Sequence, residues 1–424
     1  MTTVVARLPA NGPQASPAAA AVLAMLNRDG EEARLVGGAV RNTLLGLPSG
    51  DIDIATTAVP EIVLRRAAEA GLRAVPTGIE HGTVTLLVAG VPVEVTTLRQ
   101  DIATDGRRAT VVFGRDFARD AQRRDFTINA LYAAADGTIT DPVGGLPDLA
   151  ARRVRFIGDP EQRIREDYLR ILRLFRFHAA YGEGPLDRAA LDAALRQRDG
   201  LARLSAERIR TELFKLLAAR RAAAMLQEVA DAGFLDRILA TAPDTGAFAT
   251  LAAESAPDPV LGLAALALYS RDDALRLQER LRLSNADTSR LEVAALVLAA
   301  LHNTTASLGS GRLRALAYRH GISAVRDGLR LSAARAGAWP LPLEAARAAR
   351  VLDEPLPRCP WSGAELLARG IPAGPRIGRI LARAETAWVA TDFPQDAARQ
   401  VALLDAAIAA DGDSTPLPGR PALD

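Results

Sequence analysis

Two aspartates separated by one residue are the strongest chemical signal in the sequence. Asp51-Ile52-Asp53 stands at the start of a β-branched run that predicts a strand over Ile52–Thr56. Side chains alternate along a strand, so both carboxylates lie on one face. Two carboxylates that close repel each other unless a cation lies between them, and hard oxygen ligands suit Mg²⁺. A pair of this kind in a loop is more often solvated surface.

A glycine pair precedes the acidic pair by about thirteen residues. Gly37-Gly38 follow a predicted strand at Arg34–Val36 and precede a predicted helix over Ala39–Leu45, with Arg41 in its first turn. Two glycines let the backbone approach a phosphate closely at a helix N-terminus. Alone, such a pair is usually only a turn. Combined with Asp51 and Asp53, it predicts a phosphate and metal site.

A third acid, Glu94, lies among valines in a strand predicted over Val91–Thr97. Burying a carboxylate without a partner in such surroundings is costly. Glu94 therefore either faces solvent or joins the two aspartates as a third catalytic carboxylate. The sequence leaves both alternatives open.

Arginines follow in two groups. Residues 100–122 interleave Arg with Asp and predict a solvated loop, whereas Arg124 precedes an apolar run and is placed to clamp a triphosphate. In a helix predicted through Arg163–Tyr181, Asp167 and Arg170 fall on one polar face. A surface ion pair between these two is the simpler alternative.

The residue composition and the predicted secondary structure change near residue 149. Short strands and turns fill residues 33–148, while Ala/Leu/Arg-rich helical segments fill the remainder. We expect an α+β fold: a mixed-sheet head followed by a mostly helical remainder. The predicted parts are an N-terminal arm and helix at 1–32, a head at 33–148, a neck at 149–240, and a body and tail at 241–424.

Composition excludes several classes of protein. Of the 424 residues, 49% are hydrophobic and 24% are charged, and the net charge is only +2, which excludes a disordered chain. No apolar run is long enough to span a bilayer, no signal peptide is recognised, and the one cysteine, Cys359, cannot form an internal disulfide. These features predict a cytoplasmic protein without membrane partners. No His-Asp pair or His/Cys cluster indicates a second, phosphohydrolase-type metal site.

Read in order, these segments resemble the bacterial CCA-adding tRNA nucleotidyltransferases and the related poly(A) polymerases, within the class II nucleotidyltransferases. The resemblance is dense from Leu35 to Tyr181 and thin beyond. One departure is Asn42, where the family has aspartate. The matching blocks are GGAVRNTLLG, DIDIATT, HGTVTLL, VEVTTLR, DGRR, RRDFTINALY, DPVGGLPDL, RIREDYLRILRLFRF and, more weakly, SGAELLARGIPAGPRIGRIL.

The resemblance implies a role for each matching residue. Asp51 and Asp53 would hold Mg²⁺, and Gly38 and Arg41 would contact the nucleotide near its phosphates. The remaining nucleotide-binding residues that it implies are Arg124, Asp167, Arg170, Arg173 and Arg176. The implied activity is template-independent addition of C and A to the 3′ end of tRNA from CTP and ATP, with release of pyrophosphate.

Choosing C and A without a nucleic-acid template requires a protein template. Both bases carry an exocyclic amine beside an unprotonated ring nitrogen, which match the acceptor Asp167 and the donor Arg170. U and G reverse both groups and are rejected. For RNA, Arg312, Arg314 and Arg319 belong to a run with eight arginines and two acids over 312–350, and Arg376 precedes a helical run. Solvent-facing arginines are an equally good explanation of that run.

Three alternatives remain open from the sequence. A poly(A) polymerase would share the same head. A partial enzyme would add only C or only A. A protein of another class, an RNA-binding helical protein with an inactive head, is disfavoured because Asp51, Asp53 and Arg124 are all present.

Overall fold

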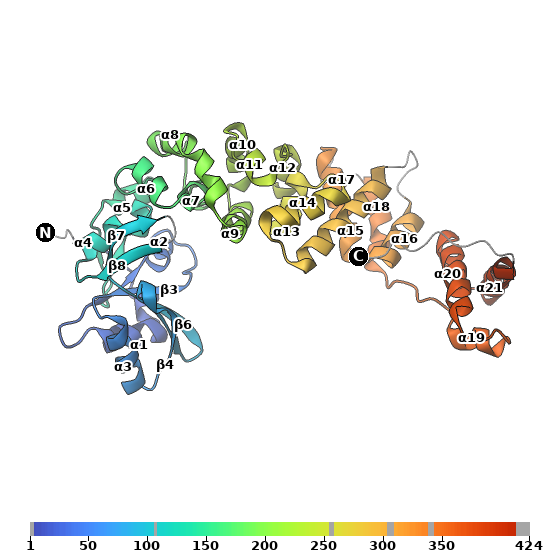
Figure 1. Cartoon of the computed structure of the whole chain (residues 1–424), viewed down its shortest axis with the longest axis horizontal. Helices are drawn as coiled ribbons and strands as arrows, with labels where there is room; N and C mark the ends of the chain where they lie inside the picture. The colour runs from blue at the N-terminus through green and yellow to red at the C-terminus, as the bar shows by residue number, and fades with distance from the viewer. Residues whose placement is uncertain (1–3, 106–107, 254–257, 303–308, 338–342, 413–424) are drawn as a thin grey trace. The chain divides into compact units, whose positions relative to one another are not determined.

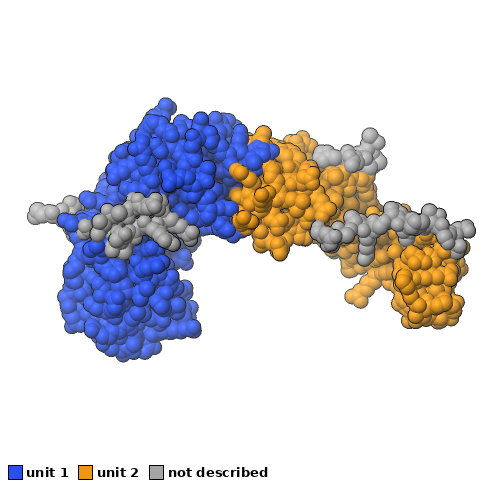
Figure 2. Space-filling model, in the orientation of Figure 1, with its two compact units in different colours: residues 1–241 blue, residues 242–424 orange. Residues whose placement is uncertain are grey.

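The computed structural model describes residues 4–105, 108–253, 258–302, 309–337 and 343–412. The chain divides into two compact units, residues 1–241 and residues 242–424, which Figure 2 colours separately. The first unit holds every strand among the described residues, and the described elements of the second are helices (Figure 1). Among the described helices, none is both long and apolar enough to cross a membrane. A mixed-sheet head followed by helices confirms the predicted fold class.

An eight-stranded sheet forms the head, in the order β1-β10-β9-β2-β3-β6-β5-β4. Strands β3 and β6 at its centre are parallel, and their neighbours on both sides are antiparallel to them. Strands β7 and β8 form a separate two-stranded sheet. The bounds are β1 Val4–Arg7, β2 Ala33–Val36, β3 Ile52–Thr56, β4 Arg73–Gly78, β5 Thr83–Val88, β6 Val91–Thr97, β7 Arg99–Asp105, β8 Arg108–Phe113, β9 Tyr132–Ala133 and β10 Thr138–Thr140.

Helices α1 (Pro17–Leu26) and α3 (Pro60–Glu69) pack on the sheet and on each other, and helix α2 (Gly38–Leu44) lies against β2 and β3. Ser16 caps α1 by accepting from the Ala19 N–H at 3.3 Å, and Pro17 begins the helix without losing a backbone donor. Strand β5 buries every second residue, as expected for a strand that is covered on one face.

The loop predicted at 100–122 is wrong, because most of its described residues belong to β7, β8 and helix α4 (Phe117–Gln122). Residues 4–7 of the N-terminal arm form β1. The β-branched run Thr127–Tyr132 predicts a strand, but Thr127–Asn129 is a 3-10 helix, η3. The Thr127 hydroxyl donates to Asp148 at 2.7 Å, and Asn129 donates to Asp125 at 3.0 Å. Such side-chain hydrogen bonds compete with a strand ladder.

The helix expected through Arg163–Tyr181 is in fact two helices. Helix α6 spans Pro160–Glu166 and α7 spans Leu169–Tyr181, so Asp167 and Tyr168 form a corner between them. Asp167 adopts extended backbone (φ −155°, ψ 106°), and its carboxylate accepts from the Leu169 N–H at 3.1 Å. A short acceptor that caps the next helix favours this break. Ile171, Leu172 and Phe175, which follow helical spacing on α7, are buried.

The remaining elements of unit 1 are helices. Helix α7 packs against α9 and α10. Their bounds are α5 Gly145–Ala150, α8 Arg188–Arg196, the 3-10 helix η4 Arg198–Arg203, α9 Ala206–Leu217, α10 Ala222–Asp231 and α11 Leu235–Leu239.

All the described secondary-structure elements of unit 2 are helices. One of its cores gathers Leu313, Leu329 and Leu352, and another is rich in aromatic residues, with Trp361, Trp388 and Phe393. The helix bounds are α12 Thr245–Ala252, α13 Pro259–Ala267, α14 Arg271–Leu281, α15 Asn285–His302, α16 Ser310–His320, α17 Ile322–Arg335, α18 Leu343–Ala349, α19 Gly363–Ala368, α20 Pro375–Ala390 and α21 Ala397–Gly412.

Candidate active site

The central parallel strands bring three carboxylates together. Asp51 directly precedes β3, Asp53 is the second residue of β3, and Glu94 is the ladder partner of Asp53 on β6. Asp51 and Glu94 are exposed, while Asp53 is half-buried. Burial raises the pKa of Asp53 to about 6, and the charges of Glu94 and Asp51 add to the effect. The neighbouring carboxylates therefore place negative charge around Asp53 and, together with its burial, disfavour its ionised form.

The carboxylate arrangement fits a divalent cation that is completed by other ligands. Among the described residues, no group of three acids, histidines or cysteines could hold a metal ion alone. Mg²⁺ commonly binds one or two protein carboxylates together with substrate phosphates and water. Asp51 and Asp53 match this pattern, and a cation bound between them would offset the repulsion that, together with burial, raises the pKa of Asp53.

The glycine pair turns the chain from β2 into α2. Gly37 has φ +70° and ψ −123°, a conformation that suits glycine, and it precedes Gly38 at the start of the helix. A Cβ on Gly37 would lie 4.0 Å from Nη1 of Arg124 and 3.9 Å from the Asn129 carbonyl oxygen. The turn therefore brings backbone close to an arginine side chain and supplies a surface that a phosphate can approach.

Arg41 of α2 is buried in the head, with a 6% exposed side chain. Its guanidinium donates to the Tyr181 hydroxyl at 2.7 Å, to the side-chain Oδ1 of Asn42 at 2.9 Å, and to the side chain of Asn129. Its guanidinium carbon also lies 3.9 Å from the centre of the Tyr181 ring. These partners are neutral, so the positive charge of Arg41 acts across the site, where it opposes the rise in the pKa of Asp53.

Arg124 is fixed by residues of the head. Its Nε donates to Asp120 at 3.1 Å and to the Tyr132 hydroxyl at 3.2 Å, and Tyr132 in turn donates to Asp120 at 2.7 Å. Asp120 is buried, with 1% exposure. Like Arg41, Arg124 lowers the pKa of Asp53 electrostatically. The acidic face of β3 and two fixed guanidinium groups therefore belong to one site.

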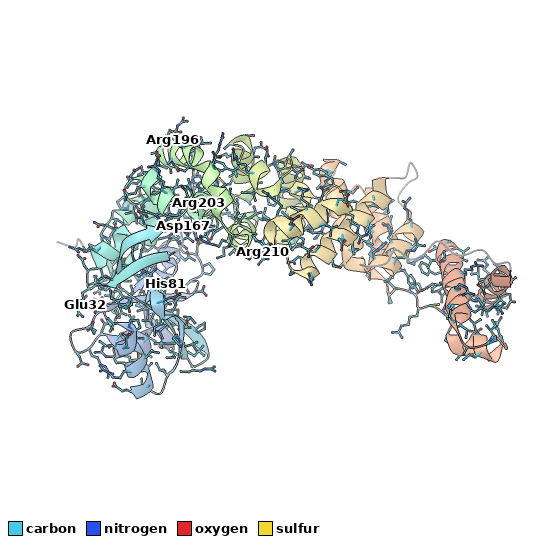
Figure 3. All side chains as sticks on the ribbon, in the orientation of Figure 1. Glu32, His81, Asp167, Arg196, Arg203 and Arg210 are labelled. Carbon is cyan, nitrogen blue, oxygen red and sulfur yellow. The ribbon has the colours of Figure 1, made fainter. Side chains whose placement is uncertain are left out.

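Asp167 and Arg170 lie at the corner between α6 and α7. Asp167 pairs with Arg208 of α9 at 2.7 Å, and Arg170 pairs with Glu166 at 2.6 Å and donates to the Arg163 carbonyl at 2.7 Å. The predicted alternative of a surface ion pair between Asp167 and Arg170 is wrong, because each has another charged partner. Figure 3 labels Asp167 in the green helical part of unit 1.

Arg173 and Arg176 lie on α7, and both pair with the carboxylate of Glu212 on α9, at 3.7 Å and 2.7 Å. Arg173 Nε also donates to Asp125 at 2.7 Å. Glu212 is only 4% exposed. Burial alone would raise the pKa of Asp125, but Arg173, Asn129 and the Phe126 N–H hold it well below its usual range.

Sequence reasoning missed the residues of α9. Arg208 and Glu212 are spaced i, i+4 and so face one side of the helix, which was the available signal. Only the packing of α7 against α9 shows that this side meets Asp167, Arg173 and Arg176.

The predicted RNA-binding arginines all lie in unit 2. Arg314 pairs with Asp392 at 2.7 Å and with Glu354 at 3.4 Å, Arg312 donates to the Ala300 carbonyl, and Arg376 pairs with Asp411 at 3.1 Å. Arg319, near the end of α16, is exposed. Three of the four arginines therefore already have partners within unit 2, and RNA binding by this set stays a prediction.

Comparison with known proteins places this geometry in a family. Residues 33–155 match the family model described as the poly A polymerase head domain, and residues 186–246 match the probable RNA and SrmB-binding site of polymerase A. A CCA-adding enzyme from Lacticaseibacillus paracasei is 34% identical over 393 residues, covering 89% of this chain and 93% of the relative.

Two further likenesses extend the comparison. The human mitochondrial CCA tRNA nucleotidyltransferase 1 is 38% identical over 274 residues, which cover 61% of this chain and 61% of that relative. The crystal structure of a Bacillus stearothermophilus CCA-adding enzyme in complex with CTP has a TM-score of 0.72 and 28% identity, covering 93% of this chain and 98% of that one. By its sequence and its fold, the chain belongs to the CCA-adding enzyme and poly(A) polymerase family of class II nucleotidyltransferases.

Proposed function

We propose that the protein adds C and A nucleotides to the 3′ end of tRNA to build the CCA terminus, using CTP and ATP and releasing pyrophosphate. One observation carries this proposal: a carboxylate pair at the start of β3 shares its site with Arg41 and Arg124 in a head of this family. The L. paracasei relative, which this chain matches along almost its whole length, is named a CCA-adding enzyme. The B. stearothermophilus structure holds CTP.

Asp51 and Asp53 are the proposed ligands of Mg²⁺. A divalent cation bound there lowers the pKa of the attacking 3′-hydroxyl and neutralises charge that develops on the α-phosphate. Arg41, Arg124 and the backbone at Gly38 bind and orient the triphosphate, so that the bond to pyrophosphate lies in line with the attack. Glu94 is the proposed third carboxylate of the site, beside Asp53 in the ladder.

Asp167 and Arg170 are the proposed protein template. Asp167 accepts from the exocyclic amine of C or A, and Arg170 donates to the adjacent ring nitrogen. Arg208 and the Leu169 N–H hold the Asp167 carboxylate, while Glu166 holds Arg170. Arg173 and Arg176 then assist nucleotide binding from the next turns of α7.

The wider assignment follows the same proposal. The head at 33–148 performs catalysis, the neck at 149–240 reads the base, and residues 241–424 bind RNA, with residues 1–32 as an N-terminal arm and helix. Location in the cytoplasm stays a prediction from the sequence.

One assay tests the proposed reaction. Purified protein is incubated with Mg²⁺ and a tRNA that lacks its CCA end, first with each nucleoside triphosphate alone and then with all four together. Addition of C, C and A that then stops supports the proposal. Long A tails would identify a poly(A) polymerase, C alone or A alone a partial enzyme, and RNA binding without addition an inactive head.

A further inference from the structure

Tyr168, the residue after Asp167, lies directly against a buried glycine. The backbone of Gly200 in η4 approaches the Tyr168 ring so closely that a Cβ there would lie 1.9 Å from Cδ1 and 2.1 Å from Cε1. Contacts below 3.0 Å are essentially never made by a real Cβ, so one side must move if Gly200 gains a side chain. The guanidinium carbon of Arg203 lies 5.4 Å from the centre of the same ring. Arg203 and Asp167 are both labelled in Figure 3.

The η4 side of this contact is anchored to three other parts of unit 1. Leu201, next to Gly200, is 5% exposed in the core. Gln197, which begins the turn, donates to Glu161 of α6 at 2.9 Å, and Asp199 pairs with Arg237 of α11 at 2.8 Å. Because the segment on both sides of Gly200 is tied down, a methyl group at Gly200 displaces the Tyr168 ring rather than η4.

A displaced Tyr168 moves its neighbour Asp167. The Asp167 carboxylate accepts from the Leu169 N–H at 3.1 Å and pairs with Arg208 at 2.7 Å, and it lies outside both helices at the corner. Hydrogen bonds weaken steeply with misalignment. The side chain that would read the exocyclic amine therefore depends on where the Tyr168 ring rests.

We propose that the contact between Tyr168 and Gly200 determines base specificity by positioning Asp167. The inference rests on the proposed function, in which Asp167 reads the base. Tyr168 and Gly200 are positioning residues, because they act through Asp167 and not on the nucleotide.

The test is the variant Gly200→Ala, measured by equilibrium binding of CTP and UTP to the full-length protein and by single-nucleotide addition to tRNA. We expect the preference for CTP over UTP to fall roughly tenfold, because one of the two matched hydrogen bonds is misaligned. Binding to the triphosphate site on the head should change less. An unchanged CTP-to-UTP ratio would overturn the proposal.

Gly328→Ala is the matched control. A Cβ on Gly328 would lie 2.3 Å from Cγ1 of Val297, a comparable clash in unit 2. It should lower the melting temperature and leave the CTP-to-UTP ratio as in the wild type. If both variants lower the ratio equally, the effect is one of general destabilisation and the proposal is wrong.

A double-mutant cycle with Tyr168→Leu separates the ring contact from other effects of the methyl group. Tyr168→Leu alone should lower the ratio, and Gly200→Ala should lower it little further in that background, because no ring remains to be displaced. Equal effects of Gly200→Ala in both backgrounds would refute the proposal. If Gly200→Ala does not fold, Tyr168→Leu decides, since an unchanged ratio in it also refutes the proposal.

Nucleotide binding distinguishes a failure of the positioning contact from a failure of the proposed reaction. A wild-type protein that prefers CTP over UTP in binding, loses this preference in Gly200→Ala, and yet adds nothing to tRNA would overturn the proposed reaction and support the positioning contact. A wild-type protein that adds CCA while Gly200→Ala keeps full selectivity would do the reverse.

Discussion

The acidic face of β3 carries uncompensated charge, whereas charges on the face shared by α7 and α9 are paired. On β3, burial and the charges of Glu94 and Asp51 raise the pKa of Asp53 to about 6. Between α7 and α9, opposite charges pair, as in Arg176 with Glu212 and Asp167 with Arg208. Uncompensated charge suits binding of a cation and phosphates. Compensated charge suits groups that must keep one hydrogen-bond geometry.

The largest expected effect comes from removing the uncompensated charge. Asp51→Ala or Asp53→Ala should lower nucleotide addition by at least about a thousandfold, since the proposed metal loses half of its protein ligands. The fold should persist, because these carboxylates repel each other in the metal-free protein. Turnover with Mg²⁺ and the melting temperature are the measurements. Near-normal turnover in either variant would move the metal site elsewhere.

Removing a compensated charge should change selectivity more than rate. Asp167→Ala leaves β3 intact, so phosphoryl transfer should continue, while the preference for C over U falls about tenfold to a hundredfold. Arg170→Ala should act similarly from the donor side. Single-nucleotide addition to a tRNA that ends at its discriminator base is the measurement. A C-to-U ratio unchanged in both variants would eliminate the protein template.

The uncompensated charge of Asp53 should also change the free energy of unfolding with pH. Its pKa in the fold, about 6, is above the usual aspartate value of 3.8. Ionising Asp53 therefore destabilises the fold, and this cost is complete above pH 6 and absent below about pH 4. Asp53→Asn should therefore stabilise the metal-free protein at pH 8 by about 1–3 kcal/mol, and this gain should vanish as the pH falls to 4. Urea unfolding across this pH range measures it. A gain that is independent of pH would assign the effect to something other than charge.

The sequence predicts the acidic face of β3 better than the face shared by α7 and α9. The predicted strands at Ile52–Thr56 and Val91–Thr97 have the bounds found in the structure. Their β-branched residues and flanking turns are local signals, and strand alternation then places the acids. The hairpin of β7 and β8 was missed because its interleaved Arg and Asp residues give no apolar alternation.

The partners on the helical side are set by tertiary packing. Arg208 is 41 residues from Asp167, and Asp125 is 48 residues from Arg173. No local pattern joins such distant residues. The break at Asp167 was missed for another reason: one side-chain cap overrides helical periodicity that continues on both sides of it.

A smaller effect is expected from Glu212, which neutralises two arginines at once. Glu212→Gln keeps the shape and an acceptor but removes the charge beside Arg176 at 2.7 Å and Arg173 at 3.7 Å. We expect KM for CTP to rise roughly fivefold to tenfold, since removing the carboxylate charge of a buried ion pair leaves both guanidinium groups uncompensated, with kcat less affected. Steady-state kinetics measures this, with Glu228→Gln on the exposed face of α10 as the control. Equal KM values in the two variants would limit Glu212 to a structural role.

The smallest effect compares two arginines of α16 in unit 2. Arg319 is exposed, whereas Arg314 pairs with Asp392 at 2.7 Å. If this helix binds the tRNA backbone, Arg319→Gln should lower the slope of log Kd against log salt by about 1, because one fewer counterion is released. Arg314→Gln should change that slope less, because its charge is already compensated within the protein. Filter binding of tRNA between 50 and 200 mM salt covers the range where phosphate contacts dominate affinity. Identical slopes for wild type and Arg319→Gln would place the RNA contact on another surface.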